Sequence, residues 1–243
     1  MFPHMNYAPQ GYPSYAQKPS LTRVSPSDML WKSYRWMSIG LALTGLVAMG
    51  IASSPSAVEL LFGNRILFML VMLAQFGLVI GFSAAAPRVS TTAAAAMFLG
   101  YAALSGVTFS SIFLIYTATS IAKVFFITGG AFAGLSVFGA VTKRDLSSIG
   151  RFALFAVIGI IIASLVNMFL ASTSLDWLIS IVGVVVFGAL TAYDTQKLKE
   201  MFASGEVRGN LALVGALTLY LDFINMFLFL LRIFGGRRGS SDY

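Results

Sequence analysis

Two aspartates stand out in this chain because each lies inside a long run of uncharged, mostly apolar residues. Of the nine acidic residues, only Asp194 and Asp222 have this setting. A carboxylate at the centre of a membrane-spanning helix costs roughly 2.5 to 3.5 kcal/mol on insertion scales, so it must face a partner or a wet cavity. Two carboxyls that share such a site titrate as one coupled unit and therefore sense pH. When both are ionised, their oxygens are the hard ligands that Ca²⁺ prefers, which makes the pair a candidate metal site.

The residues around both aspartates predict polar helix faces that point into the protein. On the last span, polar and small residues recur with Asp222 at spacings of three and four, and Thr191 precedes Asp194 by three residues on the sixth span. Asp222 lies about 16 Å along its helix, and Asp194 reaches a similar depth if its helix continues to Phe202. The residues that we predict to line a pore or cavity are Gly215, Thr218, Asn225 and Thr191.

One cationic residue lies where its side chain can interact with this pair. Arg88 follows Pro87 at the end of the second span. Its long side chain can snorkel along the helix and hold an ionised carboxylate in a salt bridge. The alternative for Arg88 is a simple anchor among the lipid headgroups.

Other site chemistries are excluded by composition. The chain has no cysteine, and its only histidine, His4, lies in the N-terminal leader. Thiolate chemistry, Cys-based metal sites and a histidine base within a span are therefore ruled out. We expect no bound cofactor and no enzymatic activity.

The elements that must position these residues are membrane-spanning helices. Of the 243 residues, 58% are hydrophobic and 10% are charged, against about 25% charged in an ordinary soluble domain. We predict an all-α membrane protein with a disordered cytoplasmic leader (1–27), a transmembrane domain (28–235) and a short basic tail (236–243). The glycine pairs Gly77/Gly81 and Gly130/Gly134 predict close helix packing. The uncharged runs place the seven spans at 34–52, 66–86, 93–118, 124–141, 152–171, 177–197 and 211–231.

The distribution of lysine and arginine predicts the orientation. Most of these residues lie in the leader and in the second, fourth and sixth connections, which indicates a cytoplasmic N-terminus. Seven full spans then put the C-terminus outside, whereas a re-entrant last segment would return the basic tail to the cytoplasm. The net charge of +7 suits loops beside anionic lipid, so the bilayer is the expected partner and nucleic acid is not.

Three motifs carry a resemblance to a known family. Residues 215–235 read GALTLYLDFINMFLFLLRIFG, residues 193–196 read YDTQ, and residues 142–147 read TKRDLS. The last helix resembles the C-terminal motif of the Bax inhibitor-1 family, and the two shorter motifs resemble its sixth helix and the loop before its fifth. The resemblance implies seven helices with the C-terminal helix in the middle of the others. For a bacterial member it also implies a pH-sensitive Ca²⁺ leak in the plasma (inner) membrane.

The same resemblance implies roles for three residues. The family's pH-sensing aspartates match Asp194 and Asp222, and its basic residue at the end of the second helix matches Arg88. We therefore predict that Arg88, bridged to ionised Asp194, holds the second helix against the last one until protonation weakens the bridge and acid opens the path.

Three other functions remain to be weighed against the leak. The first is a non-conducting regulator that binds other membrane proteins, such as a membrane protease. In such a protein the aspartates would only hold the helices together. The second is an intramembrane aspartyl protease, which Tyr193-Asp194 resembles; however, Tyr220-Leu221-Asp222 stands where those enzymes carry Gly-x-Gly-Asp. The third, a retinal protein, is excluded because the last span contains no lysine.

Overall fold

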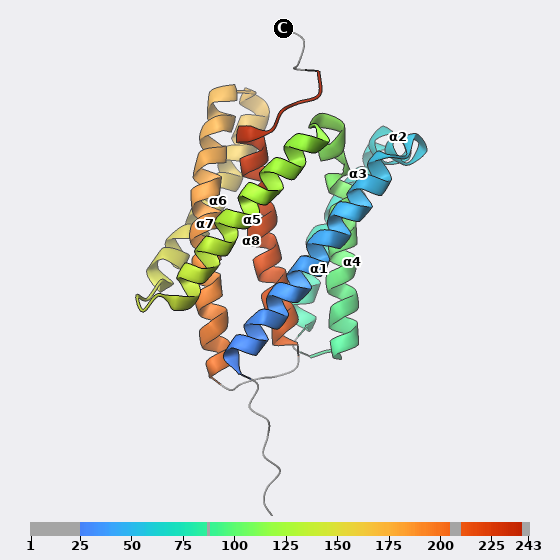
Figure 1. Cartoon of the computed structure of the whole chain (residues 1–243). Helices are drawn as coiled ribbons and strands as arrows, with labels where there is room; N and C mark the ends of the chain where they lie inside the picture. The colour runs from blue at the N-terminus through green and yellow to red at the C-terminus, as the bar shows by residue number, and fades with distance from the viewer. Residues whose placement is uncertain (1–24, 87, 205–209, 240–243) are drawn as a thin grey trace, which may run out of the picture.

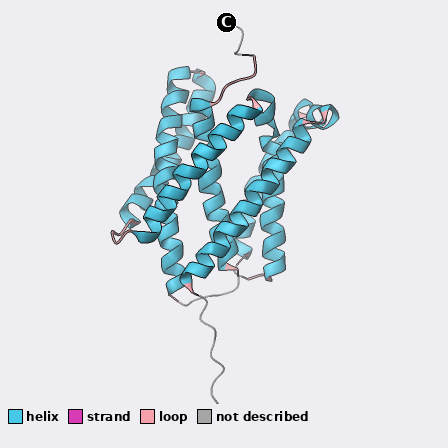
Figure 2. Cartoon of the chain, viewed as in Figure 1, coloured by secondary structure: helices cyan, strands magenta, loops and turns pink. Residues whose placement is uncertain are grey.

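The computed structural model describes residues 25–86, 88–204 and 210–239, and these residues form helices joined by short connections (Figures 1 and 2). Seven of the helices are long and apolar enough to cross a membrane, and α2 is short. The all-α fold with seven spans is therefore confirmed. The helices are α1 (Pro26–Ala52), α2 (Pro55–Gly63), α3 (Arg65–Ala85), α4 (Thr91–Ile115), α5 (Ala118–Val141), α6 (Ser147–Leu170), α7 (Thr173–Ala203) and α8 (Leu211–Phe234).

Side chains just before several helices complete their first turns. The first amides of a helix have no partner within it, and this loss matters most where water is scarce. Ser90 accepts from the amide of Ala93 at 3.2 Å, and Asn64 accepts from the amide of Leu67 at 3.1 Å. Polar residues in these connections thus help to fix where these two helices begin.

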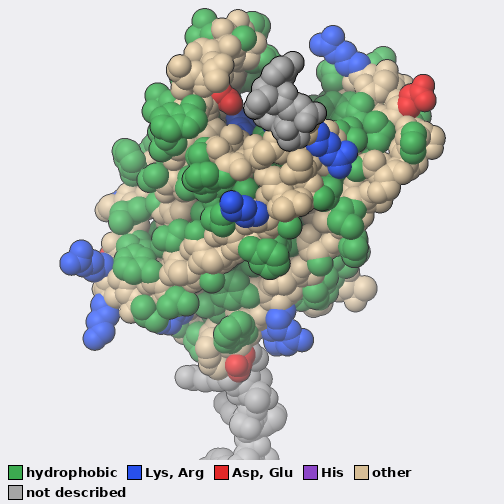
Figure 3. Space-filling view, turned by 45° about the horizontal axis from the view of Figure 1, so that its top comes forward, with side chains coloured by type: hydrophobic (Ala, Val, Ile, Leu, Met, Phe, Trp, Pro, Cys, Tyr) green, Lys and Arg blue, Asp and Glu red, His purple; other side chains and the backbone are tan. Residues whose placement is uncertain are grey.

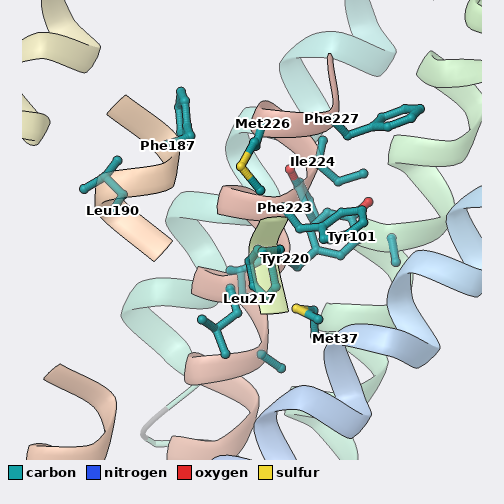
Figure 4. Packing of buried hydrophobic residues seen from close by; sticks show 14 of the residues in the cluster. Met37, Tyr101, Phe187, Leu190, Leu217, Tyr220, Phe223, Ile224, Met226 and Phe227 are labelled. Atoms are coloured by element: carbon teal, nitrogen blue, oxygen red, sulfur yellow. The ribbon is translucent and has the colours of Figure 1, made fainter. Parts of the chain in front are cut away.

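The C-terminal helix α8 is the central element of the bundle, as predicted. It packs against α1, α5 and α7 and more lightly against α4, and it is the most buried of the seven spans (Figure 1). Tyr220 of α8 is fully buried, and its hydroxyl lies 2.7 Å from that of Thr44 in α1. Tyr220 and Phe223 pack close to Met37 of α1 (Figure 4). By contrast, α3 packs mainly on α4, and α6 mainly on α7, so these two spans lie at the periphery.

The start of α1 and the end of α8 lie at opposite ends of the bundle, and α8 runs between these ends as one continuous helix (Figure 1). Its 24 residues rise about 36 Å, which is enough to cross a bilayer. The chain after α8 is held at the turn between α4 and α5, where Ile115 accepts from the amide of Arg238 at 2.9 Å. The re-entrant alternative is therefore wrong. Which end faces the cytoplasm stays a prediction, and most of the predicted leader lies outside the described residues.

Amide side chains fix the turns at the end of the bundle where α1 begins. The side-chain amide of Asn210 donates to the carbonyls of Ala86 and Val89 at 2.8 and 2.7 Å, which joins the α3–α4 turn to the start of α8. Gln196 of α7 accepts from the amide of Leu146 at 2.9 Å. These hydrogen bonds place both turns beside the helices that carry the two aspartates.

The predicted glycine pairs do not mark helix contacts. A Cβ built at Gly77, Gly81, Gly130 or Gly134 meets no atom within 4 Å, so the close packing expected there is wrong. Such pairs require a facing helix to act, and these glycines face outward. The closest approach is at Gly139 of α5, which lies directly against the backbone of Ala192 in α7.

Asp145 gives the turn between α5 and α6 a dependence on pH. Its carboxylate accepts from the amide of Ser147 at 2.8 Å, and hydrogen bonds to Ser147 hold the pKa of Asp145 below its ordinary value. Because the pKa is lowered in the folded protein, these hydrogen bonds stabilise the turn at pH values above the ordinary pKa of an aspartate. This stabilisation is lost as the pH falls through the lowered pKa of Asp145.

We therefore compare hydrogen exchange at the Ser147 amide in the parent protein and in the Asp145→Asn variant. The ratio of the parent rate to the variant rate should rise as the solution is acidified. The asparagine keeps an acceptor oxygen but does not titrate, so it is the matched control. Hydrogen exchange of the detergent-solubilised protein measures this. Equal pH profiles for the two proteins would contradict the assignment.

Candidate functional site: an aspartate pair

Helices α7 and α8 bring the two aspartates together at one level of the bundle. Helix α7 continues to Ala203, which puts its end about 14 Å beyond Asp194, close to the 16 Å that separates Asp222 from the start of α8. Both of these helix ends lie at the same end of the bundle (Figure 1). The carboxyl groups are in direct contact, within hydrogen-bonding reach of each other. The long sixth span is thus what makes the pair possible.

The two carboxyls differ in their access to water. Asp222 is only 4% exposed, and its Oδ2 has no hydrogen-bond partner within the described residues, whereas Asp194 is half-buried. Two ionised carboxylates in contact repel each other strongly in a poorly solvated site. A contact of this kind is favoured when the two carboxyls share a proton.

A partly open cavity of about 820 Å³ lies between α6, α7 and α8 and contains both aspartates. We call it the aspartate cavity. Its walls are mostly apolar, with Leu154 and Leu221 among them, and its polar groups gather around the pair. Two of the predicted lining residues, Thr218 and Asn225, line this cavity.

The other two predicted lining residues lie elsewhere. Gly215 is two turns nearer the start of α8, where the same face is closed by other helices: a Cβ there would meet the Ser33 hydroxyl at 2.7 Å and Leu198 at 3.1 Å. Thr191 is fully buried, and its hydroxyl donates to the carbonyl of Phe187 at 2.8 Å. A helix face read from sequence does not reveal where along its length a neighbour covers it.

Arg88 does not reach the pair in this structure. Its side chain is exposed, and no ion pair joins it to either aspartate among the described residues. Helix α3 packs against α4 and α2, and Arg88 lies in the turn just after its end. The predicted bridge to Asp194 would require that end to move.

The cations that lie at the cavity are Lys197 and Arg151. The charge of Lys197 acts directly on Asp194, from one turn further along α7. Sequence reasoning counted both residues only as loop charges that set the orientation. The spacing of three residues between Asp194 and Lys197 places both on one helix face, and that signal identifies the lysine as a neighbour of the pair.

The donor set suits a passing cation better than a resident one. The cavity offers two carboxylates, the Thr218 hydroxyl and the Asn225 amide oxygen as oxygen ligands. Nowhere in the described chain do three or more acidic, His or Cys residues gather to hold a metal ion. Ca²⁺ takes about six to eight oxygen ligands, so water must complete its shell here. Sparse ligation of this kind allows an ion to leave as readily as it enters.

Comparisons with known proteins match almost all of the described chain. The family model described as inhibitor of apoptosis-promoting Bax1 matches residues 27–239. The chain is 50% identical over 210 residues to the inner membrane protein YbhL of Escherichia coli, covering 84% of this chain and 90% of YbhL. It is 47% identical over 218 residues to a protein of Borreliella burgdorferi, covering 88% of this chain and 94% of that one. With seven apolar helices, these similarities support an integral inner membrane protein.

Proposed function

The chain belongs to the Bax inhibitor-1 family, and we propose that it is a pH-sensitive calcium leak whose opening is set by Asp194 and Asp222. The observation that carries the proposal is the contact of these two carboxyls inside a cavity lined by three helices. A buried acid pair is costly to keep in a membrane protein, and such residues usually belong to an ion or proton pathway.

In this proposal the shared proton couples pH to helix packing. When the pair holds its proton, α7 and α8 stay in contact at the aspartates and Arg88 is free, as in the arrangement described above. When the proton leaves, an ionised Asp194 attracts cations, and Arg88 then swings toward it with its end of α3. The bridged state is closed, so falling pH opens the path, and full protonation of the pair weakens its attraction for Ca²⁺.

Residues of the aspartate cavity then interact with the ion along its route. Ca²⁺ enters the aspartate cavity as a partly hydrated ion, with the Thr218 hydroxyl and the Asn225 amide oxygen replacing some of its water. The apolar walls keep other water out, which strengthens the attraction between the ion and the carboxylates. Lys197 and Arg151, at the same cavity, oppose the entry of cations and so keep the leak slow.

A pH series of Ca²⁺ flux tests the proposal. Liposomes that contain only this purified protein and a trapped calcium dye are compared with protein-free liposomes between mildly alkaline and mildly acidic pH. We expect flux that depends on the protein and rises as pH falls. The absence of protein-dependent flux at every pH would overturn the leak and leave a regulator that acts through other membrane proteins as the better explanation.

Arg88→Gln tests the closed state separately. If Arg88 bridges ionised Asp194, its removal raises flux at alkaline pH by roughly tenfold or more, the effect of losing a charged hydrogen bond worth about 1.5 to 3 kcal/mol. Arg65→Gln, at the opposite end of α3, is the matched control and leaves the flux unchanged. If Arg88→Gln behaves like the parent protein, the bridge has no part in gating.

A further inference from the structure

A second large hollow lies on another face of the molecule, between α1 and α5. It has a volume of about 1160 Å³, with Phe223 of α8 on its floor. Helices α1 and α5 both pack against α8 but have little contact with each other, so they border a trough (Figure 1). We call it the lateral groove. It shares neither aspartate with the cavity already described.

The lateral groove opens toward the hydrocarbon of the bilayer. Its borders include Leu46, which is 68% exposed, Phe126, which is 76% exposed, and Val137, which is 62% exposed. Hydrophobic side chains are spread over much of the face that Figure 3 shows. An empty apolar trough loses dispersion contacts on every wall, and water gains no hydrogen bonds in it. Apolar chains must therefore occupy the groove.

One end of the groove carries a positive charge. Lys199 of α7 lines it near the start of α1, and its ammonium donates to the carbonyl of Ala140 at the end of α5. Trp31, 67% exposed, lines the same end, where an aromatic ring suits the headgroup level. Lys32 and Arg35 are exposed on the neighbouring turn of α1. Asp28 and Glu200 are the exposed acidic residues on the neighbouring turns of α1 and α7.

A buried hydroxyl also lies along the groove without a partner. Ser136 of α5 is 6% exposed, and its Oγ has no hydrogen-bond partner among the described residues. It lies four residues before Ala140, about 6 Å deeper along the helix than the carbonyl that holds Lys199. An ester carbonyl below a phosphate is an acceptor that would reach about this depth.

We propose that the lateral groove binds an anionic phospholipid from the leaflet at the N-terminal end of the bundle. Its phosphate pairs with Lys199, its glycerol esters lie near Ser136, and its acyl chains run along α5 past Gly129 and over Phe223. Lys199 is the only charged residue that lines the groove in the described chain, which favours a lipid from that leaflet over one from the other. This charge also favours a lipid over an apolar partner helix, which brings no anion to Lys199.

Lipid binding to the purified full chain tests the headgroup contact. Native mass spectrometry compares phosphatidylglycerol with phosphatidylcholine, each added to the delipidated protein in detergent. We expect the parent protein to bind phosphatidylglycerol more tightly than phosphatidylcholine. Lys199→Gln should bind phosphatidylglycerol about fivefold more weakly, the effect of one lysine near an anionic membrane surface, and should bind phosphatidylcholine as before. Lys143→Gln, at the same end but outside the groove, is the control. Equal binding of both lipids by the parent protein would overturn the headgroup assignment.

Two neighbouring glycines of α5 test the acyl-chain contact. A Cβ at Gly129 or at Gly130 meets no atom within 4 Å, so the fold tolerates a side chain at either position, but only Gly129 lines the groove. We expect Gly129→Leu to lose both lipids and Gly130→Leu to keep them. Retention of both lipids by Gly129→Leu would overturn the site. So would a photo-crosslinker at position 129 that captures a polypeptide instead of a lipid in cells. Neither readout depends on calcium flux.

Discussion

Asp222→Asn is expected to make the pH dependence of calcium flux much shallower. A gate that depends on one shared proton changes by at most about tenfold per pH unit, and a gate that no longer needs this proton changes by less. In the proposed mechanism the two carboxyls of the parent protein share that proton because they are in contact. The asparagine amide donates to Asp194 at every pH and does not titrate, so the contact between α7 and α8 no longer requires a proton. The slope of log flux against pH therefore falls well below that of the parent protein, as measured by dye flux in liposomes.

Asp176→Asn is the control for this substitution. Asp176 is an exposed aspartate of α7 at the other end of the bundle, where its carboxylate lies 3.4 Å from Arg232. We expect it to leave the pH profile unchanged, since an exposed ion pair contributes little. If Asp222→Asn and Asp176→Asn give the same profile as the parent protein, the aspartate pair is not the pH sensor.

The sequence was sufficient to predict the seven spans and the depth of the two aspartates. Uncharged runs have the length of a bilayer crossing, and a carboxylate inside such a run must find a polar neighbour. Asp194 and Asp222 follow from these two facts, and the polar stripe on α8 correctly orients Thr218 and Asn225 toward the same cavity. The resemblance, not the pattern of residues, supplied the central position of α8.

The remaining features depend on which helix lies opposite which residue. Gly77 and Gly130 have the spacing of a helix contact but face outward, and Gly139 makes the closest contact without any such spacing. Lys199 looks like an ordinary loop charge until α5 and α1 place a groove beside it. Periodicity gives the direction of a side chain around its own axis, but the neighbour on that side is a property of the whole fold.

Gly139→Ala is expected to have the largest effect on stability, because α5 and α7 leave no room for a methyl group there. A Cβ at Gly139 would overlap the Ala192 carbonyl oxygen and lie 2.8 Å from its carbonyl carbon. These are backbone atoms of a buried helix, so they cannot rotate away as a side chain would. The two helices must separate, at a cost of about 1 to 3 kcal/mol for one added methyl group.

The same contact connects stability with the proposed gate. Ala192 is two residues from Asp194, so any displacement of α7 by α5 also moves the carboxylate that touches Asp222. Gly139→Ala should therefore lower the melting temperature in detergent and also alter the pH profile of flux. Gly134→Ala, on the same helix with open space around it, should change neither. A Gly139→Ala protein with the parent melting temperature would show that α5 and α7 do not pack this closely in the membrane.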